Sequence, residues 1–385
     1  MMTAFQFQTV PTLLHDYGAC RRLGEILRER FDKKRLSLVT DAYLFKSGLL
    51  SPALDNLIKT GWDVCVISDV VADPPESVVL AAAEKSRAFQ AEIIVGLGGG
   101  SSMDVAKLIA VLASEEQALS EMYGIDKITA TRLPLVQIPT TAGTGSEVTP
   151  ISIVTTGNTT KAGVLSARLY ADLTILDTEM TMGLPPRITA ATGIDAMVHA
   201  IEAYTSRIKK NPLSDMLARE ALRLLSGNLL AACRNGNDRP AREAMLLGAT
   251  LAGQAFANAP VAAVHALAYP IGGLFHVAHG LSNALVLPHV LHFNLPAAAP
   301  LYAELADIVL PAPGRSIEAG AQALVDWAAG LATSTGIESR LRDVGIGTKD
   351  LSTLATEAML QTRLLGNNPR PLQLEDAMRI YQAAY

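Results

Sequence analysis

The 385-residue sequence predicts an α/β N-terminal domain with a parallel, Rossmann-like sheet, followed by an all-α C-terminal domain. Two observations support this fold class. In the first half, short β-branched runs alternate with amphipathic helical stretches, an order that produces parallel strands covered by helices. After the Gly-Leu-Pro-Pro sequence at 183–186, the strand signals stop and Ala- and Leu-rich helical segments follow. We therefore expect an α/β domain over 1–183 and a helical domain over 184–385.

Six segments carry the strand signal, and they lie at 36–40, 64–68, 93–97, 135–138, 151–155 and 173–176. The amphipathic helical stretches between them include 21–30, 77–89 and 103–113. The strand segments are short and rich in Val, Ile and Leu, which is typical of strands that are buried on both faces of a parallel sheet.

The composition narrows the class of protein. Hydrophobic residues make up 49% of the chain and charged residues only 18%, whereas average domains are roughly 25% charged. The net charge of −5 provides no basic footprint, so no nucleic-acid partner is expected. Residues 1–12 lack the regions of a signal peptide, and the three cysteines are scattered without a CxxC pair. Both features indicate the cytoplasm.

The charge shortage is concentrated between residues 244 and 303, where no Asp, Glu, Lys or Arg occurs. An apolar run of roughly 20 residues can span a bilayer. Prolines, amides and five histidines interrupt this stretch, however, so the uninterrupted apolar run of a spanning helix is missing. We interpret it as the buried centre of a soluble protein and expect no membrane segment.

A glycine-rich turn joins the strand at 93–97 to the next helix, with the sequence GGGSSMD at 98–104. Adjacent glycines let the backbone approach a ligand, and a helix N-terminus attracts phosphate. Gly99, Gly100, Ser101 and Ser102 are therefore candidate phosphate contacts, unless the glycines serve only the geometry of the turn. Ser101 and Asp104 also fit a capping box, which predicts the helix start. The GxGxxG fingerprint is not matched, and a candidate ribose carboxylate lies upstream at Asp41.

A second loop follows the strand at 135–138, with the sequence PTTAGTGSE at 139–147. Its hydroxyl groups come from Thr140, Thr141, Thr144 and Ser146, and its small residues leave the backbone accessible. Both loops lie at the carboxyl ends of strands, where ligands bind in open α/β sheets. Together they indicate a dinucleotide site.

A cluster of histidines and one carboxylate indicates a metal site. Asp195 and His199 are four residues apart in a helical stretch, so they share one face. His265 lies in the segment 261–269, which we expect to be helical up to Pro270, and His279 follows 14 residues later. Both lie in the uncharged stretch, where buried imidazoles need partners. The alternative is that Asp195 closes a capping box with Thr192 and that the imidazoles are core histidines. The histidines at 276, 289 and 292 fit hydrogen-bonded core or pocket positions better than ligand positions.

The two loop sequences at 98–104 and 139–147 are followed along the chain by four further segments: GIDAMVHAIE at 193–202, HALAYPIGG at 265–273, HGLSNA at 279–284 and LPHV at 287–290. With them the sequence resembles the iron-containing (group III, metal-dependent) alcohol dehydrogenase family. The resemblance implies a nucleotide-binding domain like that of dehydroquinate synthase and an active site between the two domains. It also implies a homo-oligomer.

The resemblance further implies that Asp195, His199, His265 and His279 bind Fe²⁺, with Zn²⁺ as the alternative. For the dinucleotide it implies contacts with a set of residues in the first domain and its loops: Asp41, Asp73, Gly99, Gly100, Ser101, Ser102, Thr140, Thr141, Thr144, Thr149 and Lys161. A carboxylate at position 41 would repel a 2′-phosphate, so NAD is favoured over NADP.

Two positions depart from the family pattern. Many members have a histidine four residues after the third ligand, and here Tyr269 takes that place, which leaves the proton route open. A phenol has an unperturbed pKa of about 10 and is a different acid–base group from an imidazole. Asp73 precedes Pro74 where Asn is common.

The expected reaction is reversible hydride transfer between NAD(H) and a small alcohol or aldehyde. Alternatives within the superfamily are a hydroxyacid-oxoacid transhydrogenase, a hydroxyacid dehydrogenase, a glycerol-dehydrogenase-like zinc enzyme and a maleylacetate reductase-like enzyme. The last would be expected to have lost metal ligands, whereas all four are present. A lyase or cyclase of the dehydroquinate synthase type would need clustered basic residues for a polyanionic substrate. A non-catalytic nucleotide-binding module would leave the four ligands without a purpose.

Overall fold

The computed structural model describes residues 4–115, 117–157 and 160–385, which form two compact units. The α/β unit comprises Thr9–Thr141 and Ser146–Met182. The helical unit contains Gly183–Tyr385 together with residues 4–8 and Ala142–Gly145. The four residues Ala142–Gly145 thus belong to the helical unit, although they lie inside the range expected for the α/β domain.

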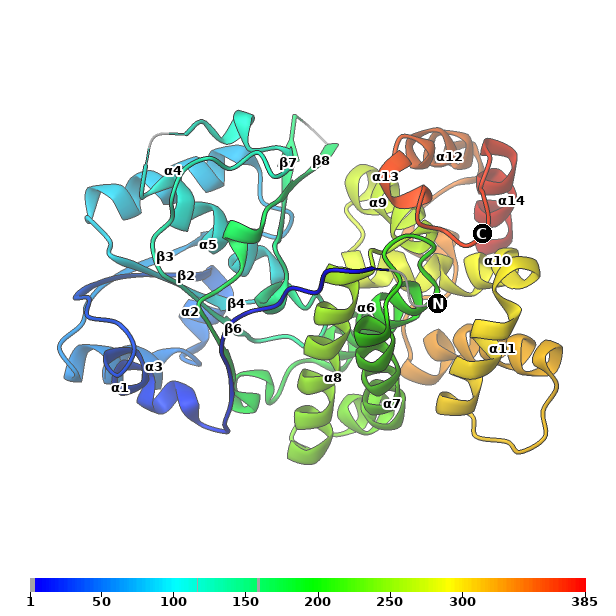
Figure 1. Cartoon of the computed structure of the whole chain (residues 1–385), viewed down its shortest axis with the longest axis horizontal. Helices are drawn as coiled ribbons and strands as arrows, with labels where there is room; N and C mark the ends of the chain where they lie inside the picture. The colour runs from blue at the N-terminus through cyan, green and yellow to red at the C-terminus, as the bar shows by residue number, and fades with distance from the viewer. Residues whose placement is uncertain (1–3, 116, 158–159) are drawn as a thin grey trace. The chain divides into compact units, whose positions relative to one another are not determined.

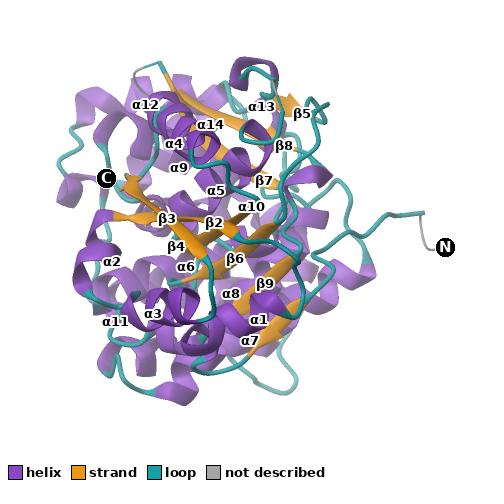
Figure 2. Cartoon of the chain, turned by 90° about the vertical axis from the view of Figure 1, so that its left-hand side faces the viewer, coloured by secondary structure: helices purple, strands orange, loops and turns teal. Residues whose placement is uncertain are grey.

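A six-stranded parallel sheet with the order β1-β9-β6-β4-β2-β3 forms the centre of the α/β unit (Figures 1 and 2). Its strands are β1 (Leu13–His15), β2 (Arg35–Asp41), β3 (Asp63–Val70), β4 (Ile93–Gly98), β6 (Leu135–Pro139) and β9 (Leu173–Leu176). Five of the six predicted strands are therefore confirmed as members of one parallel sheet. β1 was not predicted, because three residues at a sheet edge carry too little periodic pattern.

The predicted strand at 151–155 exists, but its expected parallel pairing is wrong. It is β7 (Ile151–Thr156), and it pairs antiparallel with β8 (Thr160–Leu165) in a separate small sheet of the order β5-β8-β7. The third member, β5 (Gly124–Ile125), has two residues. β8 has the sequence TKAGVL, in which Val and Leu come only at the end, so the sequence gives little strand signal there.

Helices cover both faces of the large sheet, as Figure 1 shows for α1 and α3 on one side and α4 and α5 on the other. Alternation along β2 explains this arrangement, because Leu36 and Leu38 belong to one apolar core and Val39 to the other. The helices of this unit are α1 (Leu23–Arg28), α2 (Ala42–Ser47), α3 (Ser51–Lys59), α4 (Glu76–Ala88) and α5 (Gly100–Leu112). Short 3₁₀ helices are η1 (Ala19–Arg22), η2 (Leu119–Glu121), η3 (Ser146–Val148), η4 (Ala167–Leu169) and η5 (Thr178–Thr181).

Within its described residues, the second unit consists of helices and loops only. The helices are α6 (Pro186–Thr205), α7 (Pro212–Arg234), α8 (Arg239–Asn258), α9 (Ala263–Phe275), α10 (His279–Val309), α11 (Ile317–Thr335), α12 (Leu351–Met359), α13 (Thr362–Leu365) and α14 (Leu374–Ala384), with 3₁₀ helices η6 (Leu341–Val344) and η7 (Thr348–Asp350). The helix expected to stop before Pro270 continues to Phe275, because α9 includes the proline in its interior.

Helix α10 is the one described helix that is long and apolar enough to cross a membrane by length and composition. Pro288, Pro296 and Pro300 lie inside it, so these prolines interrupt the apolar sequence without ending the helix. Its contacts are those of a core helix, because it packs against α6, α9, α11 and α14. Its buried residues include Ser282, Asn283 and Asn294, which the interior of a helical protein can satisfy with hydrogen bonds.

A buried lysine connects α5 to the second loop. Lys107 donates hydrogen bonds from Nζ to Ser146 Oγ at 2.7 Å, Thr149 Oγ1 at 3.2 Å and the carbonyl of Ile151 at 2.6 Å. Asp104 lies 3.5 Å from the same Nζ and accepts from Ser146 Oγ. Burial lowers the pKa of Lys107, and the nearby carboxylates oppose that shift. The network therefore fixes the two candidate ligand loops to each other.

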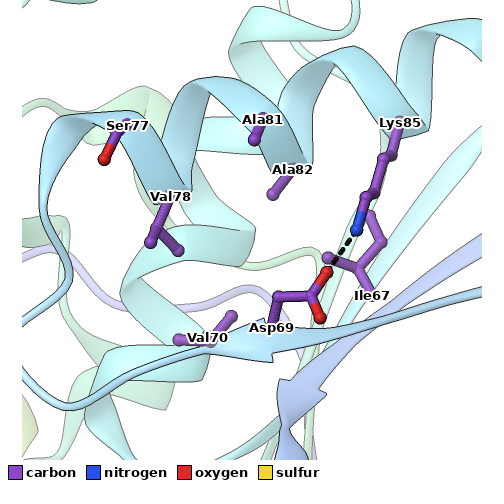
Figure 3. Close-up of a pocket in the computed structure, with 8 residues that line it drawn as sticks. All are labelled: Ile67, Asp69, Val70, Ser77, Val78, Ala81, Ala82 and Lys85. Carbon is purple, nitrogen blue, oxygen red and sulfur yellow. Dashed lines mark hydrogen bonds and ion pairs between the residues drawn. The ribbon is translucent and has the colours of Figure 1, made fainter.

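We predict that Lys107→Met lowers the free energy of unfolding by about 3 kcal/mol, because the variant leaves buried oxygens without their donor. Urea unfolding of the full chain measures this change. Lys85→Met is the matched control, since Lys85 pairs with Asp69 at the mouth of a shallow apolar hollow between β3 and α4 (Figure 3). Both partners of that pair are exposed, so its loss should cost less than about 1 kcal/mol. Equal losses in the two variants would contradict the role given to the buried network.

Candidate functional site

Three helices of the second unit bring four candidate metal ligands together. Asp195 and His199 lie one turn apart on α6, His265 lies in the first turn of α9, and His279 is the first residue of α10. One potential ligand atom from each residue lies within 4.8 Å of those of the other three. The alternative capping box at Asp195 is excluded, because Thr192 lies inside α6 and donates to the carbonyl of Ile188.

The cluster is closed on the α6 side and more open at His279. Asp195, His199 and His265 are buried, whereas the His279 side chain is 38% exposed. Asp195 Oδ1 lies 3.6 Å from His279 Nε2 and 3.9 Å from His265 Nε2. His279 is therefore the side from which a metal ion or a substrate would reach the cluster.

The donor set has the charge and the protonation that a divalent cation needs. Burial lowers the pKa of His199 to about 3, although the charge of Asp195 opposes this shift, so its imidazole is neutral at ordinary pH. Burial alone would raise the pKa of Asp195, but the surrounding histidines and a hydrogen bond from Asn283 lower it. Among the described residues, the ion-pair contacts of Asp195 are with histidines only. A carboxylate and three imidazoles fit iron or zinc.

Aromatic rings pack against the imidazoles of the cluster. The ring of His199 stacks between Phe256 of α8 and His265, with centroid distances of 4.3 and 4.7 Å. Tyr269 lies one turn after His265, and its ring is 5.9 Å from that of His279. Tyr269 is therefore beside the cluster, at its more exposed side.

Two buried polar side chains complete the cluster, and neither was predicted. Asn283 donates from Nδ2 to Asp195 Oδ1 at 2.6 Å and lies 3.3 Å from Nε2 of both His265 and His279. Glu202 contacts His265 Nδ1 through Oε2 at 2.6 Å. Helical spacing was the available signal, because position 202 is seven residues after Asp195 and position 283 is four after His279.

The remaining histidines of the uncharged stretch were expected in core or pocket positions rather than as ligands. None of them belongs to the ligand cluster, and none is fully buried. His276 and His292 are exposed, and His289 is half-buried. His276 also follows the end of α9 with a left-handed backbone (φ 56°). Its position is explained by this helix ending, which places the side chain outside the packed interior.

In the α/β unit, the glycine-rich turn lies at the carboxyl end of β4. Gly99 is the N-cap of α5, so Gly100, Ser101 and Ser102 form the first helical turn. The predicted capping box is wrong: among the described residues, no side chain caps this helix, and Asp104 instead accepts from Ser146 Oγ and the amide of Ile153. The helix N-terminus thus keeps the form of an anion site.

The second loop begins beside this turn, because Gly98 pairs with Pro139 and Thr140 donates its amide to the carbonyl of Gly98. Thr140 and Thr149 are buried, while Thr141 and Thr144 are half-buried. Gly143 and Gly145 have a packing role: a Cβ on Gly143 would lie 2.7 Å from Thr192 Cβ, and one on Gly145 would lie 2.5 Å from the Cα of Gly253. These two glycines are therefore required by the packing of the helical unit.

The other candidate cofactor residues have defined local roles. Asp41 is the N-cap of α2 and accepts from the amides of Tyr43 and Leu44. Asp73 has a left-handed backbone (φ 53°), which Asp and Asn tolerate better than most residues. Its carboxylate lies 2.5 Å from Lys161 Nζ. An Asp in place of the Asn common in the family thus adds an ion pair with Lys161, and it tolerates the left-handed backbone as Asn does.

Comparisons with known proteins agree with this architecture. The family model "Iron-containing alcohol dehydrogenase" matches residues 11–178, and "Fe-containing alcohol dehydrogenase family, C-terminal" matches residues 189–385. Long-chain-alcohol dehydrogenase 1 of Geobacillus thermodenitrificans is 41% identical over 97% of this chain and 95% of its own length.

Solved structures are similar over the whole chain. A crystal structure of a 1,3-propanediol oxidoreductase superposes with a TM-score of 0.95 at 34% identity, covering 100% of both chains. A sulfoacetaldehyde reductase from Bifidobacterium kashiwanohense, crystallised in complex with NAD⁺, has a TM-score of 0.88 at 28% identity over 99% of each chain. This chain therefore belongs to the iron-containing alcohol dehydrogenase family and is an oxidoreductase that acts on CH–OH groups.

Proposed function

We propose that this protein is a metal-dependent, NAD(H)-linked alcohol dehydrogenase and aldehyde reductase. The observation that carries the proposal is the convergence of Asp195, His199, His265 and His279 within 4.8 Å. Fe²⁺ is the proposed ion and Zn²⁺ the alternative, because four protein ligands plus a substrate oxygen exceed the tetrahedral set typical of zinc. The substrates are small alcohols and aldehydes, and the working enzyme is a cytoplasmic homo-oligomer.

The bound ion would supply Lewis-acid polarisation of the substrate oxygen, and the nicotinamide would accept or donate the hydride. The chain itself provides the other requirements. Residues of α9 and α10 next to the ligands are buried and apolar, and they would keep water and charged side chains from the reacting carbon. In the oxidation direction the alcohol loses its hydroxyl proton, and the phenol of Tyr269, whose ring lies 5.9 Å from that of His279, would take part in moving it.

The dinucleotide is proposed to bind along the carboxyl ends of β2, β4 and β6. Gly99, Gly100, Ser101 and Ser102 would meet the pyrophosphate at the N-terminus of α5. The other contacts are assigned to Asp41, Asp73, Thr140, Thr141, Thr144, Thr149 and Lys161. NAD is favoured over NADP because the Asp41 carboxylate at the end of β2 would repel a 2′-phosphate.

We predict that His199→Ala or His265→Ala abolishes turnover and lowers the metal content of the purified protein together, because each change removes one of four ligands. Metal analysis combined with NAD(H)-linked assays of several alcohols and aldehydes measures both effects. His292→Ala is the control, since this histidine is exposed on the same unit. Full turnover by either ligand variant after its metal has been removed would refute the metal role.

Asp41→Ser should increase kcat/KM with NADP by about tenfold or more, a change of about 1.4 kcal/mol, because the variant removes the repelling charge. Serine is also a good N-cap, so α2 should keep its start. Asp41→Gly tests the same charge with a weaker cap. If both variants leave the NADP activity unchanged, Asp41 does not face the adenosine ribose.

Tyr269→Phe should lower kcat by about 10²- to 10⁴-fold, the usual effect of losing a general acid–base group. The metal content should not change, because the phenyl ring keeps the contact with His279. Tyr269→His introduces the residue common in the family and should retain more activity than the Phe variant. A Phe variant that keeps its kcat within about twofold would exclude the phenol from the proton route.

A further inference from the structure

Glu202 is a buried carboxylate in the helical unit whose purpose the proposed reaction does not explain. It lies on α6, seven residues after Asp195, and is 4% exposed. Burying a carboxylate is unfavourable unless hydrogen bonds or charges compensate for it. The partners of its two oxygens therefore indicate why it is retained.

Both oxygens of Glu202 bind the same short segment of α9. Oε1 accepts the backbone N–H of Val264 at 2.7 Å, and Oε2 lies 2.6 Å from Nδ1 of His265. The N-cap of α9, Ala262, offers no side-chain acceptor, so the carboxylate supplies one from a neighbouring helix. A negative charge is also favourable at a helix N-terminus. Glu202 thus fixes both the backbone of Val264 and the ring of His265, the next residue.

The contact with Nδ1 selects the tautomer of His265. A carboxylate only accepts hydrogen bonds, so Nδ1 carries the proton, and in the neutral imidazole that binds a metal Nε2 then presents its lone pair. That Nε2 lies 3.3 Å from Nδ2 of Asn283, which is a donor, and 3.9 Å from Asp195 Oδ1. The lone pair therefore points into the cluster of candidate ligands.

The charges agree with this arrangement. Asp195 and Glu202 are two buried carboxylates joined through one imidazole, and among the described residues neither forms an ion pair with Lys or Arg. One divalent cation would balance the two negative charges. A carboxylate that orients a ligating imidazole raises its basicity, and loss of such a partner typically weakens metal binding by about 10- to 100-fold.

We propose that Glu202 is a positioning residue for the metal centre, which holds His265 in the Nδ1–H tautomer and thereby sets the affinity of the site for a divalent cation. This inference rests on the proposed function for the identity of the ligands. Glu202 is not a catalytic residue, because its carboxylate acts through the imidazole.

Glu202→Gln is the sharpest variant, because it preserves size and removes one acceptor. The two donors lie on different oxygens of Glu202, so the single carbonyl oxygen of a glutamine in the same place would meet Val264 N–H or His265 Nδ1–H, but not both. If the oxygen stays on Val264, the amide N–H₂ faces Nδ1 and favours the opposite tautomer. Asp376→Asn is the matched control: this carboxylate is also buried in the helical unit but accepts from Gln373 N–H at the start of α14.

The affinity of the full-length protein for Co²⁺ and Zn²⁺ should be measured at one fixed pH by competition with a chelator, together with the visible absorption of bound Co²⁺. Glu202→Gln should bind about 10- to 100-fold more weakly and show an altered Co²⁺ spectrum, whereas Asp376→Asn should match the parent. A purely structural role would lower the unfolding free energy of Glu202→Gln but leave its affinity within about twofold of the parent. That result would overturn the proposal.

Histidine ¹⁵N NMR of the metal-free full chain gives an independent test on the parent sequence, so it applies even if the variant fails to fold. The signal of His265, assigned by its loss in His265→Ala, should report a protonated Nδ1. An unprotonated Nδ1 would refute the role of Glu202. A parent that binds no metal would instead refute the proposed function, while the tautomer would still decide the contact between Glu202 and His265.

Discussion

The burial of a carboxylate without a basic partner is the constraint on which the helical unit depends. Asp195 is 2% exposed, and the helices α9 and α10, which contribute side chains around it, contain no lysine or arginine. An ionised group in such a place is costly unless other groups compensate for it. Here the compensation comes from Asn283, from three imidazoles and, in the proposed enzyme, from a divalent cation. The helices α6, α9 and α10 must therefore meet in one geometry, because each supplies a part of that compensation.

The α/β unit also contains a buried charged side chain that other groups must compensate, but this one is positive. Lys107 is fully buried, and hydroxyls, a carbonyl and Asp104 surround its ammonium group. In both units a single buried charge joins segments that are far apart in the sequence. The difference lies in how the charge is balanced. Protein groups are sufficient for Lys107, whereas the two carboxylates near His265 contact imidazoles, the Asn283 amide and the Val264 N–H but, among the described residues, no Lys or Arg. The second arrangement favours a bound cation, and the first favours a fixed loop.

Sequence reasoning predicted the fold wherever a repeated pattern existed. Buried strands such as β4 are continuous runs of apolar residues and glycine, and the ligand pair on α6 follows helical spacing. It failed where tertiary contacts override local preference. Ser101 and Asp104 have capping-box spacing, but Asp104 bonds to Ser146 and the amide of Ile153. Pro270 looked like a helix end, yet packing keeps α9 continuous past it to Phe275. Glu202 was overlooked because a single glutamate on a helix is usually solvated, and only its partner on α9 reveals its role.

The uncharged stretch 244–303 affects how the unfolded polypeptide aggregates before it folds. Sixty residues without a charged side chain contain none of the gatekeeper charges that keep unfolded chains apart. Two of the candidate ligands lie within it, so capture of an ion would draw the most aggregation-prone part of the chain into the native state. Binding to the native state stabilises it in proportion to the logarithm of the free metal concentration. The supply of metal in the cell would then determine the yield of intact protein as well as its activity, and light scattering during refolding at graded metal concentrations would show that dependence.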